Sequence, residues 1–166
     1  MDESFRRATT LFLPLRRGDA VLDGEGRRVA SIIRGTRTMS VVEPGGTRFS
    51  IAEFKERSGW FRKPWEITRE RRTIARSWQQ GWWDYEQSCY RRVQLFLWAA
   101  DASFNLLDEV TSEPVVRAKY VKLELPRGER LHREKTVRIE FEPSAHELDR
   151  PIAIAVAWAR FVGTPD

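Results

Sequence analysis

The sequence has few of the residues that build disulfide frameworks and metal centres. It contains one cysteine, Cys89, and two histidines, His132 and His146, which lie well apart. A single cysteine excludes an intramolecular disulfide and fits a reducing compartment. Neither histidine has a cysteine or another histidine at metal-ligand spacing. We therefore expect no metal site, no cofactor, surface-exposed histidines and no catalytic use of Cys89.

Long hydrophobic runs are also missing. The longest one, Pro151–Val162, has about a dozen residues, whereas a helix needs about 20 to span a bilayer. The chain begins Met-Asp-Glu-Ser-Phe-Arg-Arg, which is acidic at the start and shows no signal peptide. The sequence predicts a cytoplasmic protein without a transmembrane segment.

Recognisable catalytic patterns are absent as well. The glycines of Gly24-Glu25-Gly26 suit a hairpin turn and not a phosphate-binding loop, since no helix is expected to follow them. Paired carboxylates such as Asp108-Glu109 fall at a turn, where acidic residues are common for reasons of solvation. No nucleophile has a partner base. We expect a protein that is not an enzyme, with no catalytic residues.

The bulk composition describes a basic globular protein. With 166 residues the chain is long enough for one domain with a sizeable core, and 41% hydrophobic against 32% charged residues excludes a disordered chain. The net charge of +5 permits weak attraction to phosphate-bearing partners. Acidic and basic residues are interleaved, so much of this charge is expected on a solvated surface.

Short β-strands dominate the expected secondary structure. Turn signals recur at short intervals and separate runs rich in β-branched and aromatic residues. In the last run Val137, Ile139 and Phe141 alternate with Thr136, Arg138, Glu140 and Glu142, which is typical of an antiparallel strand with one wet face. The clearest predicted strands are Val29–Ile33, Arg48–Phe54, Trp65–Thr68, Thr73–Trp78, Val93–Trp98, Val115–Leu125 and Thr136–Glu142.

A weak internal repeat supports a meandering sheet. The segments Ala20–Arg34 and Phe104–Tyr120 both follow the outline strand, polar turn, strand, with Leu-Asp before the turn. Trp65–Trp78 is a looser third copy. Any two hairpins share this outline, which is the alternative explanation. Repeated hairpins still favour an antiparallel meander over a βαβ arrangement.

The C-terminal run is apolar on nearly every side, so protein must surround it. Asp149 is expected to be a helix N-cap, with Pro151 in the first turn and Gly163 as the stop. Four alanines favour this helix, although alternation also permits a buried central strand. A mostly β chain that ends in such a segment predicts a barrel plugged by it.

The most unusual local composition is an Arg-rich and Trp-rich stretch between Gly59 and Tyr85. Aromatic and basic residues together suit single-stranded nucleic acid or an anionic membrane interface. Large strand aromatics also fill cores, and the arginines would then mark only a hairpin tip. The candidate ligand-binding residues are Arg62, Lys63, Arg69, Arg71, Arg72, Trp82 and Trp83, with Trp82 and Trp83 on a turn beside the arginines.

The layout resembles the tubby C-terminal-like superfamily, in its LURP-one-related and phospholipid-scramblase-like branch. The hairpin Val21–Ala30 and the terminal segment Glu147–Ala159 carry the resemblance, which extends from about Phe12 to the end. It implies a mainly β fold: one closed antiparallel barrel of about a dozen strands around a hydrophobic helix, residues 149–163. Residues 1–10 are expected to form a loose arm of this single domain. The chain lacks the Pro-rich region, palmitoylation cysteines and acidic calcium loop of scramblases.

Two functions follow as expectations. The first is a non-catalytic binding module that contacts anionic lipid headgroups or another phosphate-bearing partner, with nucleic acid as a weaker possibility and no protein partner assigned. The second is a calycin-like barrel that carries a small apolar ligand in an open lumen. The position of Ile152–Trp158 distinguishes them, because a carrier needs that space free.

Overall fold

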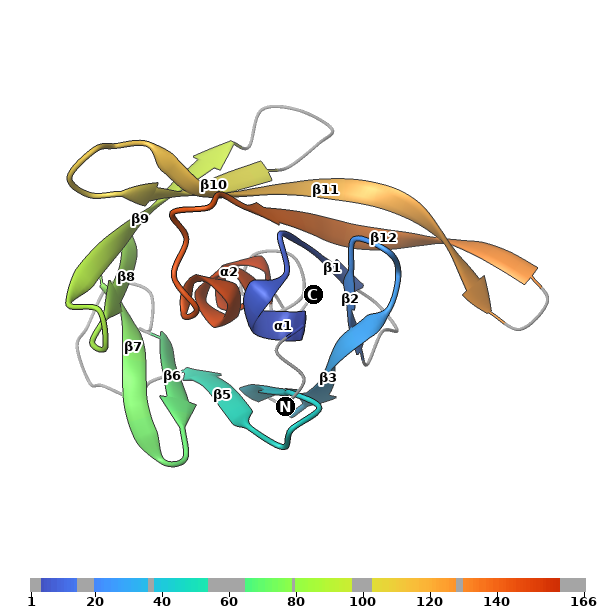
Figure 1. The fold of residues 1–166 in the computed structure, drawn as a ribbon, viewed down its shortest axis with the longest axis horizontal. Helices are drawn as coiled ribbons and strands as arrows, with labels where there is room; N and C mark the ends of the chain where they lie inside the picture. The colour runs from blue at the N-terminus through green and yellow to red at the C-terminus, as the bar shows by residue number, and fades with distance from the viewer. Residues whose placement is uncertain are drawn as a thin grey trace.

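The described residues form twelve antiparallel strands that close into one barrel (Figure 1). The structure, a computed structural model, describes residues 4–14, 20–35, 38–53, 65–78, 80–96, 103–127 and 130–158. Strands pair in chain order, and the first pairs with the last. The expected mainly β barrel is therefore confirmed. The elements are α1 (Ser4–Arg7), β1 (Thr10–Pro14), β2 (Ala20–Asp23), β3 (Arg28–Arg34), β4 (Thr38–Val42), β5 (Arg48–Glu53), β6 (Trp65–Arg69), β7 (Arg72–Trp78), β8 (Gly81–Asp84), β9 (Cys89–Phe96), β10 (Ser103–Asp108), β11 (Pro114–Arg127), β12 (Arg130–Phe141) and α2 (Asp149–Ala157).

Alternation along the strands points one face of each into the barrel. In β12, Val137, Ile139 and Phe141 are buried, as the period of two predicts. Thr136 was predicted on the wet face, but it is fully buried. It lies opposite Pro14 of β1 and Val121 of β11, so neighbouring strands flank it on both sides.

Three aspartates end strands and organise the turns that follow them. One carboxylate oxygen of Asp23 accepts the N–H groups of Glu25 and Arg27. Asp108 does the same for Val110 and Thr111 after β10. Such side-chain bonds fix a turn by satisfying donors that strand pairing leaves free. The Leu-Asp pairs of the sequence repeat thus mark equivalent hairpins.

The third such aspartate is not in the segment predicted as the third copy. The Trp65–Trp78 hairpin turns through Glu70 and Arg71, whose φ angles are +50° and +67°. The aspartate is Asp84 in the next hairpin, where it accepts the N–H groups of Glu86 and Gln87.

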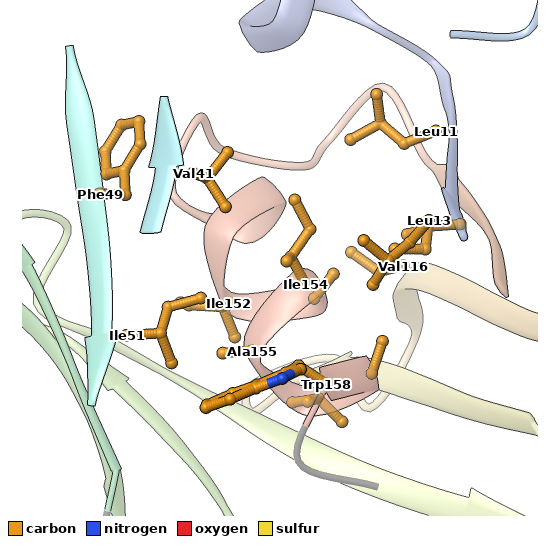
Figure 2. Close-up of a cluster of buried hydrophobic side chains, with 14 of the residues drawn as sticks. Leu11, Leu13, Val41, Phe49, Ile51, Val116, Ile152, Ile154, Ala155 and Trp158 are labelled. Atoms are coloured by element: carbon orange, nitrogen blue, oxygen red, sulfur yellow. The ribbon is translucent and has the colours of Figure 1, made fainter. Parts of the chain in front are cut away.

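The C-terminal run is a helix inside the barrel. Every residue of α2 is buried, and Figure 2 shows Ile152, Ile154 and Trp158 between Ile51 on one wall and Leu13 on the other. The indole of Trp158 packs edge-on against Trp65 of β6, with ring centroids 5.0 Å apart. A helix apolar all round is stable in water only in such surroundings.

The start of this helix differs from the prediction in one respect. Leu148 holds the N-cap position and makes no side-chain cap bond, whereas Asp149 is the first helical residue. The reason is that the Asp149 carboxylate is bound by an arginine of the barrel wall, described below. Pro151 falls in the first turn as expected, and residues after Trp158 lie outside the described part of the chain.

The predicted loose arm is wrong for residues 4–10. Ser4–Arg7 forms α1, and Phe5, only 1% exposed, packs near Phe49 with ring centroids 6.4 Å apart. Arg6 forms an ion pair with Glu43 at 3.2 Å. The Arg150 guanidinium donates to the Ala8 carbonyl at 3.0 Å. A large apolar side chain in the core holds this segment against the barrel.

Candidate functional site

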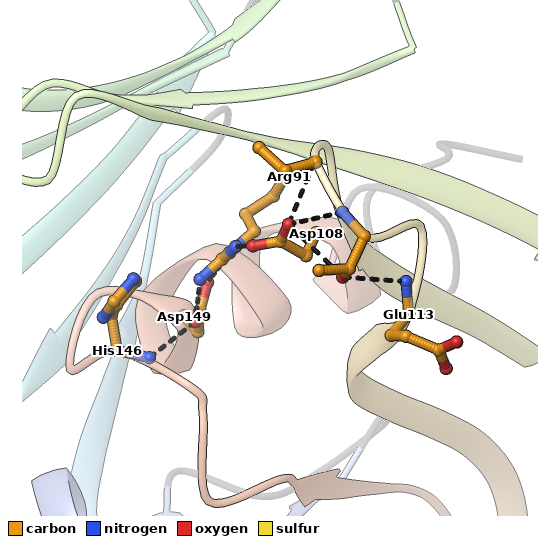
Figure 3. A network of polar contacts seen from close by, with 7 residues as sticks. Arg91, Asp108, Glu113, His146 and Asp149 are labelled. Carbon is orange, nitrogen blue, oxygen red and sulfur yellow. Dashed lines mark hydrogen bonds and ion pairs between the residues drawn. The ribbon is translucent and has the colours of Figure 1, made fainter.

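A buried polar network lies where α2 begins (Figure 3). Arg91 of β9, 1% exposed, binds Asp149 with two nitrogens: Nε to Oδ1 at 2.9 Å and Nη2 to Oδ2 at 3.2 Å. Its Nη1 donates to Asp108 at 2.9 Å. Asp149 also accepts the His146 N–H at 2.7 Å. This paired geometry makes the contact strong and directional.

The charges in this network stabilise one another. Burial by itself lowers the pKa of Arg91, but the hydrogen bond and charge of Asp149 raise that pKa above its ordinary value. The pKa of Asp108 is lowered, first by the Thr111 N–H and further by Arg91. Arg91 therefore joins the central helix, the β9 wall and the β10–β11 turn. This role is structural, because the network uses its donors internally.

Near this network, one carboxylate oxygen of Asp84 has no hydrogen-bond partner among the described residues. Asp84 is fully buried, and this oxygen is its Oδ2. Burial raises the pKa of Asp84, and the nearby Asp149 charge adds to the effect. Cys89 lies opposite Asp84 in the strand register, and burial raises the pKa of its thiol. A raised pKa keeps the thiol protonated, which is the less nucleophilic form.

The second cluster lies on the outer surface of the barrel. Among the described residues, the large hydrophobic side chains that remain exposed are Ile33, Trp78, Trp83, Tyr85, Phe96 and Val110. Four of these six lie on β7, β8 and β9 or the turn between β8 and β9. Scattered surface apolar residues need no explanation, but a local concentration is a candidate interaction surface.

The strand register arranges this surface in two rows. In the first, Trp83 lies between Arg76 of β7 and Tyr90 of β9. In the second, Trp78 and Arg92 flank Gly81. We call Arg76, Trp78, Trp83, Tyr90 and Arg92 the outer patch.

The absence of a side chain at position 81 has a steric reason. A Cβ there would lie 2.5 Å from the Tyr90 ring and 2.3 Å from the Arg91 carbonyl oxygen. The absent side chain allows the Tyr90 ring to pack over the β8 backbone, and the Tyr90 hydroxyl donates to the Trp78 carbonyl at 2.8 Å. Tyr90 is therefore held in place between the two tryptophans of the patch.

The patch carries positive charge at its edge. Arg92 is exposed and forms no salt bridge within the described part of the chain. Arg76 has Glu66 at 3.8 Å, so its charge is partly offset. The outer patch thus combines aromatic side chains with arginines at its edge.

The structure separates the two predicted tryptophans, which lie on β8 and not on a turn. Trp83 is 36% exposed and belongs to the patch, but Trp82 is 4% exposed and faces the core. Consecutive strand residues point to opposite faces, so only one of them was available to a ligand. For Trp82, the alternative of a core aromatic is correct.

The predicted basic residues also divide. Arg71 and Arg72 are exposed at the β6–β7 turn, but Arg69 forms an ion pair with Glu86 and lies over the Phe49 ring, 5.9 Å from its centroid. Arg69 is therefore a less available cation than predicted. Arg62 and Lys63 lie outside the described residues.

Of the patch residues, only Trp83 was predicted as a ligand-binding residue; the four that sequence reasoning missed are Arg76, Trp78, Tyr90 and Arg92. A signal was present, because alternation places Arg76 with Trp78, and Tyr90 with Arg92, on the same strand face. What the sequence could not supply is the pairing of β7, β8 and β9 that brings these faces together.

Comparisons with known proteins give no match. No family model fits the chain, and neither a curated protein nor a solved structure resembles it significantly. Within the described ranges, no helix is long and apolar enough to cross a membrane. The surface chemistry of the described residues is therefore what indicates a function.

Proposed function

We propose that the protein is a non-catalytic binding module that uses the outer patch to contact anionic lipid surfaces. The observation that carries this proposal is the gathering of exposed Trp78 and Trp83 with Arg92 on adjacent strands. Tryptophan and tyrosine favour the headgroup level of a bilayer, where the ring is apolar and its polar atom is solvated. Arginine beside them suits lipid phosphates.

The shape of the surface favours a membrane over a nucleic acid. The patch lies on the outside of a closed barrel, which is convex. Single-stranded nucleic acid is bound most often in a groove that follows the backbone, with bases stacked on its aromatic floor. A broad bilayer surface accepts a convex aromatic wall without such a groove.

Arg71 and Arg72 provide a second source of positive charge. Both are exposed, and they lie at the opposite end of β7 from Trp78. Each cation near an anionic surface contributes about 1 kcal/mol, and salt screens the attraction. Arg71 and Arg72 would add long-range attraction to the anionic membrane, and the outer patch would make the direct contact with it.

The position of α2 weighs against the carrier alternative. A calycin-like carrier holds its ligand in the lumen, but here Ile152, Ile154 and Trp158 occupy that space. Membership of the tubby-like superfamily, the absence of enzymatic activity and a cytoplasmic location stay predictions. The barrel around a central helix is the arrangement that the resemblance implies.

Vesicle co-sedimentation tests the proposal. Wild-type protein is mixed with phosphatidylcholine vesicles that either contain or lack phosphatidylserine. We expect binding to the anionic vesicles that weakens with salt. Trp78→Ala with Trp83→Ala should reduce affinity roughly tenfold, because two apolar contacts are lost. The matched control is Ile33→Ala, which removes an exposed apolar side chain from β3.

The charge contribution has its own control. Arg92→Glu should weaken binding to anionic vesicles by roughly tenfold or more, whereas Lys119→Glu changes a cation on β11 that is also exposed and should have a smaller effect. If wild type does not bind anionic vesicles at low salt, the proposal is wrong. Tighter binding to a mixed-sequence single-stranded oligonucleotide than to vesicles would assign the patch to nucleic acid.

A further inference from the structure

The two longest strands extend beyond the barrel. β10 pairs with β11 only as far as Lys119, and β1 pairs with β12 only from Thr136 onward. Past these points β11 and β12 pair with each other to Arg127 and Arg130. Figure 1 shows this two-stranded ribbon projecting from the barrel, away from β7 and β8.

The edges of this ribbon are open within the described part of the chain. No described strand pairs with β11 beyond Lys119 on its β10 side. An open edge presents backbone N–H and C=O groups that can pair with another chain. A two-stranded ribbon is only marginally stable alone, so a third strand on either edge would stabilise it.

The β11 edge has a self-complementary sequence. In an antiparallel pair of two copies centred on Leu123, Val121 lies opposite Leu125 of the second copy and Lys122 lies opposite its Glu124. Each register position from 121 to 125 then pairs either two apolar residues or a lysine with a glutamate. Such cross-strand pairs are the stabilising units of a sheet.

The other edge does not have this property. We consider the same antiparallel pairing of two copies for the β12 segment Leu131–Lys135, centred on Arg133. Arg133 is then opposite Arg133 of the second copy, and Leu131 is opposite Lys135. Like charges directly opposite are destabilising. The β11 edge is therefore the one suited to pairing.

We propose that the protein forms a two-fold symmetric dimer by antiparallel pairing of the β11 edge, residues 121–125, with the same edge of a second copy. A two-fold axis requires each surface to be complementary to itself, and this segment meets that requirement. Pro126 follows it and limits the pairing, since proline has no backbone N–H. A contact of five residues is small, so the dimer is weak and dependent on concentration.

A charge swap tests this pairing specifically. Lys122→Glu places glutamates at both 122 and 124, and Glu124→Lys places lysines at both. Each single variant should weaken dimerisation about tenfold or more, because two favourable cross-strand pairs become repulsive. Sedimentation velocity over a concentration series measures the effect. Lys119→Glu, on the part of β11 that pairs with β10, is the matched control and should dimerise like wild type.

Mixing the two variants gives the decisive result. A Lys122→Glu chain paired with a Glu124→Lys chain has opposite charges at both positions, so the mixture should recover the dimer. Thermal melts check that each variant is folded. A wild type that stays monomeric at all concentrations overturns the proposal. So does a mixture that associates no better than the single variants. Neither result depends on whether the outer patch binds lipid.

Discussion

Arg91 and Arg92 are neighbours in the chain and opposites in the structure. Arg91 points into the barrel, 1% exposed, and binds Asp149 and Asp108. Arg92 points outward beside Trp78 and is exposed. An arginine thus stabilises the fold on one face of β9, and an arginine on the other face is exposed, where we propose that it contacts lipid. Strand alternation alone separates the two roles.

The contrast between Arg91 and Arg92 shows where the charge of an arginine stabilises the fold. A buried guanidinium loses its water and must be compensated by fixed carboxylates, so removing one partner leaves an uncompensated charge. An exposed guanidinium keeps its water and adds little to stability. It remains available to an external anion.

The largest expected effect is the loss of the buried arginine. Arg91→Ala leaves Asp149 buried without its cation and should lower the free energy of unfolding by about 3–5 kcal/mol. Arg92→Ala, one residue away, should change it by no more than about 0.5 kcal/mol. Urea melts of both variants measure this. Equal effects would mean that the inner network does not hold α2.

The same contrast applies to two tryptophans. Trp158→Ala removes a side chain that is 6% exposed and should cost about 3–5 kcal/mol. Trp78→Ala removes one that is 63% exposed and should cost less than about 1 kcal/mol. Denaturant melts decide this too. A loss below about 1 kcal/mol for Trp158→Ala would contradict the plugged barrel.

Gly81 contacts both the backbone of the inward-pointing Arg91 and the ring of Tyr90 in the outer patch. Gly81→Ala forces the new Cβ against the Arg91 carbonyl and the Tyr90 ring, so we expect a loss of about 1–3 kcal/mol. Thermal melts measure that loss. Vesicle binding should also weaken, because Tyr90 must move within the patch. Unchanged stability together with unchanged binding would show that Tyr90 is not fixed there.

The smallest effect concerns Asp84 and depends on pH. Its pKa is raised by burial, so the ionised carboxylate opposes folding, and stability from this group is lost as pH rises through that pKa. Asp84→Asn should therefore stabilise the protein at neutral pH, because the neutral amide carries no charge that burial penalises. The gain should disappear as pH falls toward the ordinary value of 3.8, where wild-type Asp84 is protonated. Melts of both proteins across this range test it, and a gain independent of pH would contradict it.

The sequence by itself determined the fold class. Alternation in Val137–Phe141, Leu-Asp before two hairpin turns and the apolar run at Ile152–Trp158 were sufficient for a plugged β-barrel. These signals are local, since strand period, turn chemistry and helix propensity depend on near neighbours. The short strands β1, β4 and β8 were not predicted.

Only the tertiary structure decided which polar and aromatic residues share a site. No pattern among neighbouring residues indicates that Arg91 contacts Asp149, 58 residues away in the sequence. Nor does any such pattern indicate that Asp149 is the first helical residue and not the expected N-cap. Likewise the predicted pair Trp82 and Trp83 was divided between core and surface, while Tyr90 and Arg92 joined Trp83 from the next strand. Such contacts depend on strand pairing and register, and a shift of one residue would exchange the two faces.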